Sequence, residues 1–422
     1  MTTLADPTTV DVRTTGTDAP AGRFVGRRYV QLVLVLGALS AIGPLTLDTY
    51  LPALPQLRAD LGATDSQAQL TITGLLVGLG LGQLLIGPLS DAVGRRKPLL
   101  VGLTVHGLMS VLCTLAPSIT LLALTRTMQG VGGAAVAVVS MAIVRDLFSG
   151  VKAAQLLSRL MLVIGVAPVL APSLGSVLLG FTSWRGIFVL IAVAAVLLFV
   201  LALVALPETL PTVRRSSVSV RGALRSYGVL FHDRLFVVMV LVSGLSFATL
   251  FAYISGVPFL LQELYGLSPQ QFGLTFSANA VGLIVMTQVN PLLVRRVSPV
   301  TILLVAVTVS TLASAALVAT AITGFGGLVG FLVPLWFIVA SAGLSFPNAP
   351  AIALNRHGEA AGSAAALLGS AQFVLGGLIA PLVGALADGT GVPMAGVLLG
   401  TSALGLVLLL TSRRPLSSVS YR

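Results

Sequence analysis

Two charged residues lie inside stretches that are otherwise apolar and long enough to cross a membrane. Asp48 falls in the run 29–52, and Arg126 falls in the run 119–142. A charged side chain at the centre of a bilayer costs about 2.5–3.5 kcal/mol on insertion scales, so such residues usually have a function. Counted in residues, both charges lie at a similar depth in the outer half of the membrane, so they could form an ion pair if their helices face each other. A purely structural buried ion pair is the alternative.

A short polar stretch, 87–98, separates two apolar runs and contains two glycines, two prolines, one acid and three bases. Glycine and proline favour a tight turn, and cations hold a loop on the cytoplasmic side. Asp91 lies at the end of the preceding run, where it could accept hydrogen bonds from the N-terminus of a neighbouring helix, whose dipole favours an anion. This cluster of charges could join two helix ends, although the cations could equally serve topology alone. The residues concerned are Gly87, Asp91, Gly94, Arg95 and Arg96.

A third feature is a run rich in glycine and proline, with Gly165, Pro168, Pro172 and Gly175. These residues kink a helix and allow close backbone approach, and the glycines alone would indicate only packing. Polar and aromatic residues inside the runs suit a ligand cavity, and interhelical hydrogen bonding is an equally plain explanation. The residues expected to contact a substrate are Tyr50, Gln129, Ser246, Thr249 and Tyr253.

The composition shows what must position these residues. Of the 422 residues, 56% are hydrophobic and 9% are charged, whereas a soluble domain has about 25% charged residues. A membrane helix needs about 20 mainly apolar residues. Twelve runs reach that length: 29–52, 67–89, 98–116, 119–142, 154–181, 185–206, 235–260, 270–294, 300–321, 326–350, 362–387 and 391–411. The sequence therefore predicts an all-α polytopic membrane protein with twelve transmembrane helices.

The cations predict the orientation and the organisation of the chain. With the N-terminus inside, 21 of the 24 basic residues fall on the cytoplasmic side, as the positive-inside rule requires. Both termini are then cytoplasmic. A weak internal repeat indicates two pseudo-symmetric six-helix halves. The expected parts are a disordered cytoplasmic tail 1–28, a first half 29–206, a cytoplasmic linker 207–234, a second half 235–411 and a cytoplasmic tail 412–422.

Several functions are disfavoured. The single cysteine and three distant histidines give no metal-ligand spacing, so no metal site is expected. Residues 130–135 match a dinucleotide fingerprint, but they lie in the middle of an apolar run without a preceding strand. No phosphate-binding G-x-x-x-x-G-K-[ST] loop occurs, so the chain is not an ATP-driven pump by itself. An intramembrane enzyme would need paired carboxylates or a nucleophile–base cluster, and none is visible in the runs. The positions of the cations also argue against nucleic acid as a partner.

Four stretches resemble one transporter family. Residues 87–98 read G-P-L-S-D-A-V-G-R-R-K-P and resemble the signature loop of the major facilitator superfamily. Residues 47–55 and 124–134 look like the helix 1 and helix 4 motifs of the twelve-span drug/proton antiporters, especially the Bcr/CflA branch. Residues 165–175 resemble the helix 5 antiporter motif, with alanine at 167 and 171 where glycine is common.

The resemblance implies a proton-driven exporter of small amphipathic drugs in the inner (plasma) membrane, conferring multidrug or chloramphenicol-type antibiotic resistance. Asp48 would couple proton and substrate, with Arg126 as its partner. Asp91 would dock on the start of helix 11 near Ala361 and latch the outward-open state. The resemblance also implies no cofactor beyond the proton gradient, membrane lipid as surroundings, and function as a monomer. The alternatives are an exporter of a sugar or other metabolite with the same fold and, outside transport, an intramembrane enzyme.

Overall fold

The computed structural model of this protein describes residues 27–215, 227–355 and 361–412. Throughout these residues the chain forms helices joined by short turns, with no strand. The predicted all-α fold is confirmed. Residues 1–26, 216–226 and 413–422, which include most of both expected tails and part of the expected linker, lie outside the described residues.

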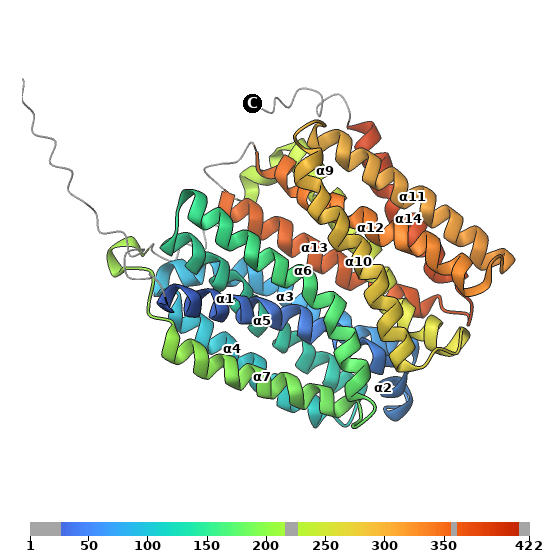
Figure 1. The fold of residues 1–422 in the computed structure, drawn as a ribbon, viewed down its shortest axis with the longest axis horizontal. Helices are drawn as coiled ribbons and strands as arrows, with labels where there is room; N and C mark the ends of the chain where they lie inside the picture. The colour runs from blue at the N-terminus through green and yellow to red at the C-terminus, as the bar shows by residue number, and fades with distance from the viewer. Residues whose placement is uncertain (1–26, 216–226, 356–360, 413–422) are drawn as a thin grey trace, which may run out of the picture.

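Every predicted apolar run coincides with a helix (Figure 1). The first half contains α1 (Arg27–Asp48), η2 (Leu51–Ala53), α2 (Leu54–Asp60), α3 (Asp65–Val93), α4 (Arg96–Thr114), α5 (Ile119–Leu147), α6 (Gly150–Leu178) and α7 (Trp184–Ala205). A short helix, η3 (Thr212–Arg214), follows it. The second half contains α9 (Arg234–Phe259), η4 (Leu260–Leu264), α10 (Pro269–Leu293), α11 (Pro299–Thr323), α12 (Gly327–Leu354), α13 (Ala361–Ala385) and α14 (Val392–Thr411).

Eleven helices within the described residues are long and apolar enough to span a membrane, and α6 supplies a shorter apolar stretch, Val163–Leu178. The outward faces of these helices are themselves apolar. On α7, for example, Leu197 and Val204 are exposed. Large exposed aliphatic side chains are expected where the surrounding medium is lipid hydrocarbon rather than water.

The first span is longer than the sequence predicted. Its helical path runs from Tyr29 to Asp60 rather than ending near residue 52. The path breaks after Asp48 and resumes as η2 and α2, each of which has a proline in its first turn. Proline fits that position because the first N–H groups of a helix have no intrahelical partner. Asp48 therefore lies twelve residues before Asp60, where this span ends.

The two halves repeat each other in packing and in helix termini. Helix α3 packs against α13, and α6 packs against α10, so the second and fifth spans of each half meet the other half. Both α3 and α10 begin with a reciprocal capping box, formed by Thr64 with Gln67 and by Ser268 with Gln271. In Figure 1 the helices coloured blue to green and those coloured yellow to red form two groups side by side.

Three glycines on one face of α3 serve close packing. A Cβ atom added at Gly78 would overlap the backbone oxygen of Thr127 on α5, and Gly74 and Gly82 face the same helix. Small residues let membrane helices approach closely enough for extensive van der Waals contact. The pairing of α3 with α5 thus fixes the position of the helix that carries Arg126.

The hydrogen bonds between the halves lie toward one end of the bundle, which we call the Asp60 end. We call the opposite end, where α3 turns into α4, the Arg95 end. At the Asp60 end, Gln69 donates to the Ser255 carbonyl at 3.0 Å and accepts from the Gly384 N–H at 2.7 Å. Further links join Arg58 to Glu263, Gln262 to Pro52, Ser66 to Pro381, Thr73 to Gly377, Gln270 to Ser176, and Ser277 to Ser173 and Val169. At the Arg95 end, Arg95 bonds to Asp91 and Asp146, which belong to the same half.

Candidate functional site

Asp48 is the last residue of α1 and is buried, with 3% of its surface exposed. No described lysine, arginine or histidine lies within ion-pair distance of its carboxyl group, and no described residue forms a hydrogen bond with its side chain. The expected ion pair with Arg126 is therefore not formed in this conformation. The acid stands at a break in the first span, deep in the membrane and without a counter-charge.

Arg126 on α5 is fully buried and is surrounded by neutral oxygen atoms and aromatic rings. Its Nη1 donates to Gln129 Oε1 at 2.7 Å and to the Thr46 carbonyl at 3.2 Å. The guanidinium carbon lies 4.3 Å from the ring centre of Tyr50 and 5.5 Å from that of Phe188. Cation–π contacts and carbonyl oxygens stabilise a desolvated cation, whereas Nη2 has no partner.

Two of the residues expected to contact substrate belong to this arginine's surroundings. The Tyr50 hydroxyl lies 3.2 Å from Thr71 Oγ1, and its ring covers Arg126. Gln129 accepts from Arg126 and donates to Ser110 Oγ at 2.7 Å. Both side chains are buried and already have partners inside the N-terminal half. In this conformation they orient Arg126 and do not line an open site.

His106 and Cys113 complete this polar interior. The two ring nitrogens of His106 lie 3.1 Å from Thr46 Oγ1 and 3.1 Å from the Gln129 carbonyl. His106 is therefore a packed histidine with both ring nitrogens in hydrogen-bond contact. Cys113 is buried and free. In the described part of the chain, no three His, Cys, Asp or Glu side chains gather closely enough to hold a metal ion.

Across the interface from Asp48, the C-terminal half presents Tyr253 on α9 and Asn279 on α10. Tyr253 lies beside Asn279 and within electrostatic range of Asp48. The Tyr253 hydroxyl and the Asn279 amide nitrogen are buried without a hydrogen-bond partner, as is Thr49 Oγ1 next to Asp48. The sequence predicts that Tyr253 faces a ligand. It gives no such indication for Asn279, because one amide in a long apolar run has no distinguishing pattern.

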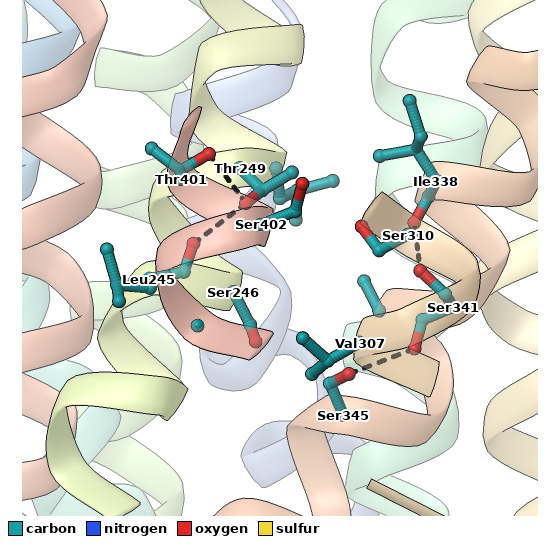
Figure 2. A pocket seen from close by; sticks show the side chains of 13 residues that line it. Leu245, Ser246, Thr249, Val307, Ser310, Ile338, Ser341, Ser345, Thr401 and Ser402 are labelled. Atoms are coloured by element: carbon teal, nitrogen blue, oxygen red, sulfur yellow. Dashed lines mark hydrogen bonds between the residues drawn. The ribbon is translucent and has the colours of Figure 1, made fainter. Parts of the chain in front are cut away.

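Ser246 and Thr249, the other residues predicted to contact substrate, line a different pocket. Figure 2 shows that pocket between helices of the C-terminal half alone, with Ser341 and Ser345 of α12 on its opposite wall. The Thr249 hydroxyl lies 2.9 Å from that of Thr401 on α14. The structure therefore separates this pair from Asp48 and Tyr253.

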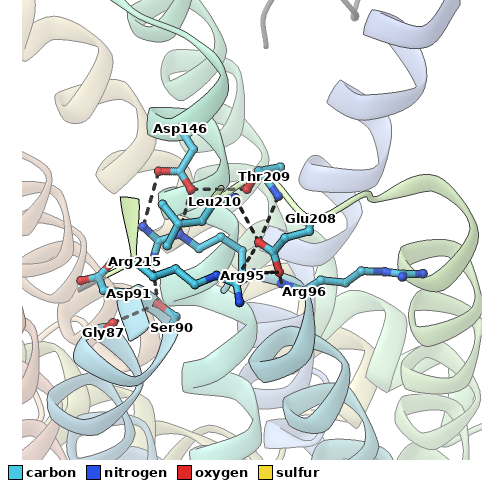
Figure 3. Close-up of polar contacts among 10 residues, drawn as sticks. All are labelled: Gly87, Ser90, Asp91, Arg95, Arg96, Asp146, Glu208, Thr209, Leu210 and Arg215. Atoms are coloured by element: carbon cyan, nitrogen blue, oxygen red, sulfur yellow. Dashed lines mark hydrogen bonds and ion pairs between the residues drawn. The ribbon is translucent and has the colours of Figure 1, made fainter. Parts of the chain in front are cut away.

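At the Arg95 end, the predicted latch residues form a compact cluster of charges (Figure 3). Arg95 Nη1 donates to Asp91 at 2.5 Å and to Ser90 Oγ at 2.8 Å, and Arg95 Nε donates to Asp146 at 2.8 Å. Asp146, near the end of α5, was not predicted, because an acid beside a predicted cytoplasmic loop is indistinguishable from an ordinary surface charge. It ties the loop to the helix that carries Arg126.

Glu208, just after α7, caps the start of α4. Its Oε1 accepts from the Arg95 backbone N–H at 2.8 Å, and its Oε2 accepts from that of Arg96 at 3.3 Å. Partial burial alone would raise the pKa of Glu208, but these N–H groups, that of Leu210 and the charge of Arg215 hold the pKa below its usual value. Gly94 has φ +99°, and a Cβ there would overlap the Glu208 carboxylate, so only glycine fits this turn.

The expected docking of Asp91 on helix 11 is not made here. Half of the Asp91 side chain is exposed, and its ion pair is with Arg95. No hydrogen bond joins it to the described residues of α13. Gly87 has open space where a side chain would be, so the structure gives no packing reason for glycine at that position. In this conformation the cluster is held within the N-terminal half.

The glycine- and proline-rich run forms α6, with Pro168 and Pro172 inside the helix. Gly175 packs so closely on the break after α1 that a Cβ would overlap the Thr49 backbone oxygen. Gly165 has no neighbour within 4 Å of that position. Of the two glycines, only Gly175 is required by packing here, and it fits α6 directly against the residue that follows Asp48.

A bundle of apolar helices in two repeated halves, with buried polar groups facing each other where the halves meet, is the architecture of a secondary membrane transporter. The sequence matches the description "Major Facilitator Superfamily" over residues 34–381. The chain belongs to this superfamily and is a multi-span membrane transporter.

Named relatives cover almost the whole chain. "Uncharacterized MFS-type transporter YdgK" of Bacillus subtilis is 37% identical over 90% of this chain and 94% of its own length. "Bicyclomycin resistance protein homolog" of Haemophilus influenzae is 31% identical over 86% of this chain and 91% of its own length. "Multidrug resistance protein MdtL" of Salmonella heidelberg is 29% identical, with 91% and 95% covered.

Solved structures share the fold. A D-xylose-proton symporter superposes with a TM-score of 0.73 at 16% identity, covering 90% of this chain and 96% of the symporter. A mutant of the nucleoside transporter NupG gives a TM-score of 0.72 at 15% identity, with 91% and 99% covered. At this identity the likeness establishes the major facilitator fold and says nothing of the substrate.

Proposed function

We propose that this protein exports small amphipathic drugs in exchange for protons, with Asp48 as the proton-carrying group. The observation that carries the proposal is the position of Asp48, buried without a counter-charge where the first span breaks and the two halves meet. The negative end of the α1 dipole and the lack of a cation both disfavour an ionised carboxylate. Opening to water would let the carboxyl O–H give its proton to solvent.

The drug class rests on the relatives whose printed names concern bicyclomycin and multidrug resistance. Within that class we favour neutral compounds of the chloramphenicol type. The only membrane-embedded acid that we assign to coupling is Asp48, and Arg126 is engaged by Gln129 and Tyr50. Arg126 would compensate the ionised state of Asp48 when the halves rearrange. A sugar or metabolite exporter of the same fold is the alternative.

The working cycle that we propose is alternating access. In the present conformation the polar links between the halves lie at the Asp60 end, and Asp91 is free of α13. Docking of Asp91 near Ala361 would accompany the opposite conformation. We place the protein in the cytoplasmic membrane with both termini inside, working as a monomer without a cofactor.

The proposal is tested in inverted membrane vesicles that carry an imposed pH gradient. Adding chloramphenicol to vesicles with the wild-type protein is expected to release protons. Asp48→Asn should abolish that release, and Asp388→Asn, in the α13–α14 loop, should leave it intact. An equal response from wild type and Asp48→Asn would place the coupling site elsewhere. If the wild-type protein is folded but no drug causes proton release, a metabolite becomes the favoured substrate.

A further inference from the structure

Two polar side chains of the C-terminal half are buried at the interface without partners. Asn279 is 3% exposed and Tyr253 is 2% exposed. The amide nitrogen of Asn279 and the hydroxyl of Tyr253 lie close to each other, but not in the geometry of a hydrogen bond, and neither has another partner. Their helices, α10 and α9, bring them side by side and within electrostatic range of Asp48. Each group lies at the meeting point of the two halves.

Other amides inside this half have hydrogen-bond partners within it. Asn348 donates to Asn290 Oδ1 at 2.6 Å, and Gln372 donates to Ser243 Oγ at 2.7 Å. Buried polar groups without partners are rare and reduce stability, so each one needs an explanation. Two such groups beside each other, opposite an unpaired acid, indicate that a partner from outside the chain binds to them when the halves move apart.

The chemistry of the pair limits what that partner can be. An amide nitrogen only donates hydrogen bonds, and a phenol donates readily, so the partner must offer an acceptor oxygen. The Tyr253 ring stacks on Phe276, with centres 5.4 Å apart and planes at 18°. This stacking fixes the phenol and adds an aromatic surface beside the polar groups. A hydrophobic cation without hydrogen-bonding atoms would leave both donors unsatisfied.

We propose that Asn279 and Tyr253 together form the hydrogen-bonding contact through which the C-terminal half selects neutral substrates that bear carbonyl or hydroxyl oxygens. The substrate oxygen accepts from Asn279 Nδ2 and Tyr253 Oη, and Asp48 faces the bound molecule from the N-terminal half. This inference rests on the proposed export function and adds its substrate chemistry. It makes these two residues specificity-determining ones.

The test is equilibrium binding to the purified full-length protein without a pH gradient. The probes are chloramphenicol, which is neutral and carries hydroxyl and amide groups, and tetraphenylphosphonium, a cation without hydrogen-bonding atoms. Asn279→Ala and Tyr253→Phe are each expected to raise the Kd for chloramphenicol about tenfold, with tetraphenylphosphonium affected less than about twofold. The matched controls are Thr275→Val, whose hydroxyl bonds back to Gln271, and Tyr265→Phe.

A stability measurement separates recognition from a structural role. Because the replaced atoms have no partner, the variants should unfold no more easily than wild type, as reported by reaction of the buried thiol of Cys113 on heating. Three results would each overturn the inference. Both variants could bind chloramphenicol with the wild-type Kd, the Kd for both probes could rise equally, or the wild type could fail to bind chloramphenicol. If these variants lose chloramphenicol binding but the wild-type protein releases no protons in vesicles, the inference stands and proton exchange is refuted.

Discussion

At the scale of single residues, Arg126 and Asp48 have different surroundings inside the membrane-spanning helices. Arg126 is held by Gln129, the Thr46 carbonyl and the Tyr50 ring, which together replace the water that it has lost. Asp48 has no such set of partners. A cation stabilised by neutral groups can remain charged through a transport cycle, whereas an acid without partners is suited to gaining and losing a proton.

Gln129 is predicted to be essential for keeping Arg126 in place. Gln129→Leu removes two buried hydrogen bonds, the one that Arg126 Nη1 donates to Gln129 and the one that Gln129 donates to Ser110 Oγ. We expect a loss of about 1–3 kcal/mol in the free energy of unfolding, measured as an earlier reaction of the Cys113 thiol in denaturant. Met128→Leu, on the exposed side of the same helix, should have little effect. Equal stability of both variants would contradict this role.

The charged residues themselves could be found from the sequence, but their partners could not. A single acid or base in an apolar run is conspicuous, so Asp48 and Arg126 are evident without a structure. Depth counted along a helix leaves its rotation open, and rotation decides whether two side chains meet. Asn279 and Asp146 could not be found from the sequence for a related reason. Each matters because of a residue distant in sequence, Tyr253 beside Asn279 and Arg95 beside Asp146.

At the scale of elements, α6 makes an unusually close contact with the break in the first span. Gly175 brings α6 against the Thr49 backbone, one residue beyond Asp48. The glycine and proline pattern predicted close packing for this helix, but not which glycine makes it. The continuation of the span after the break could not be predicted from the sequence either. Pro52 and Pro55 suggest the end of a helix, whereas each lies in the first turn of a new one.

This contact predicts opposite outcomes for two glycines of the same motif. Gly175→Ala places a Cβ against the Thr49 backbone oxygen and should lower transport about tenfold or more, because a packed backbone cannot give way cheaply. Gly165→Ala places its Cβ in open space and should be tolerated in this conformation. Transport rates at matched membrane expression compare the two. Equal impairment would mean that the motif acts by flexibility, not by the Gly175 contact.

At the scale of the whole molecule, the halves are joined by hydrogen bonds at the Asp60 end, and the charge cluster at the Arg95 end lies within one half. Twelve apolar runs were enough to predict the helices. The conformation could not be predicted, because both states of a transporter are encoded by one sequence. Asp48 lies twelve residues from the Asp60 end, where the halves meet, so a rearrangement of the halves would alter its access to water.

The most direct test of this account reconstitutes the wild-type protein and Asp48→Asn in liposomes and measures chloramphenicol in two modes. The account predicts that both proteins exchange labelled for unlabelled drug across the membrane, because the neutral amide resembles the protonated acid. Only the wild type should accumulate drug against its gradient when a pH gradient is imposed. If Asp48→Asn accumulated drug as well as the wild type does, Asp48 would not be the proton-coupling residue.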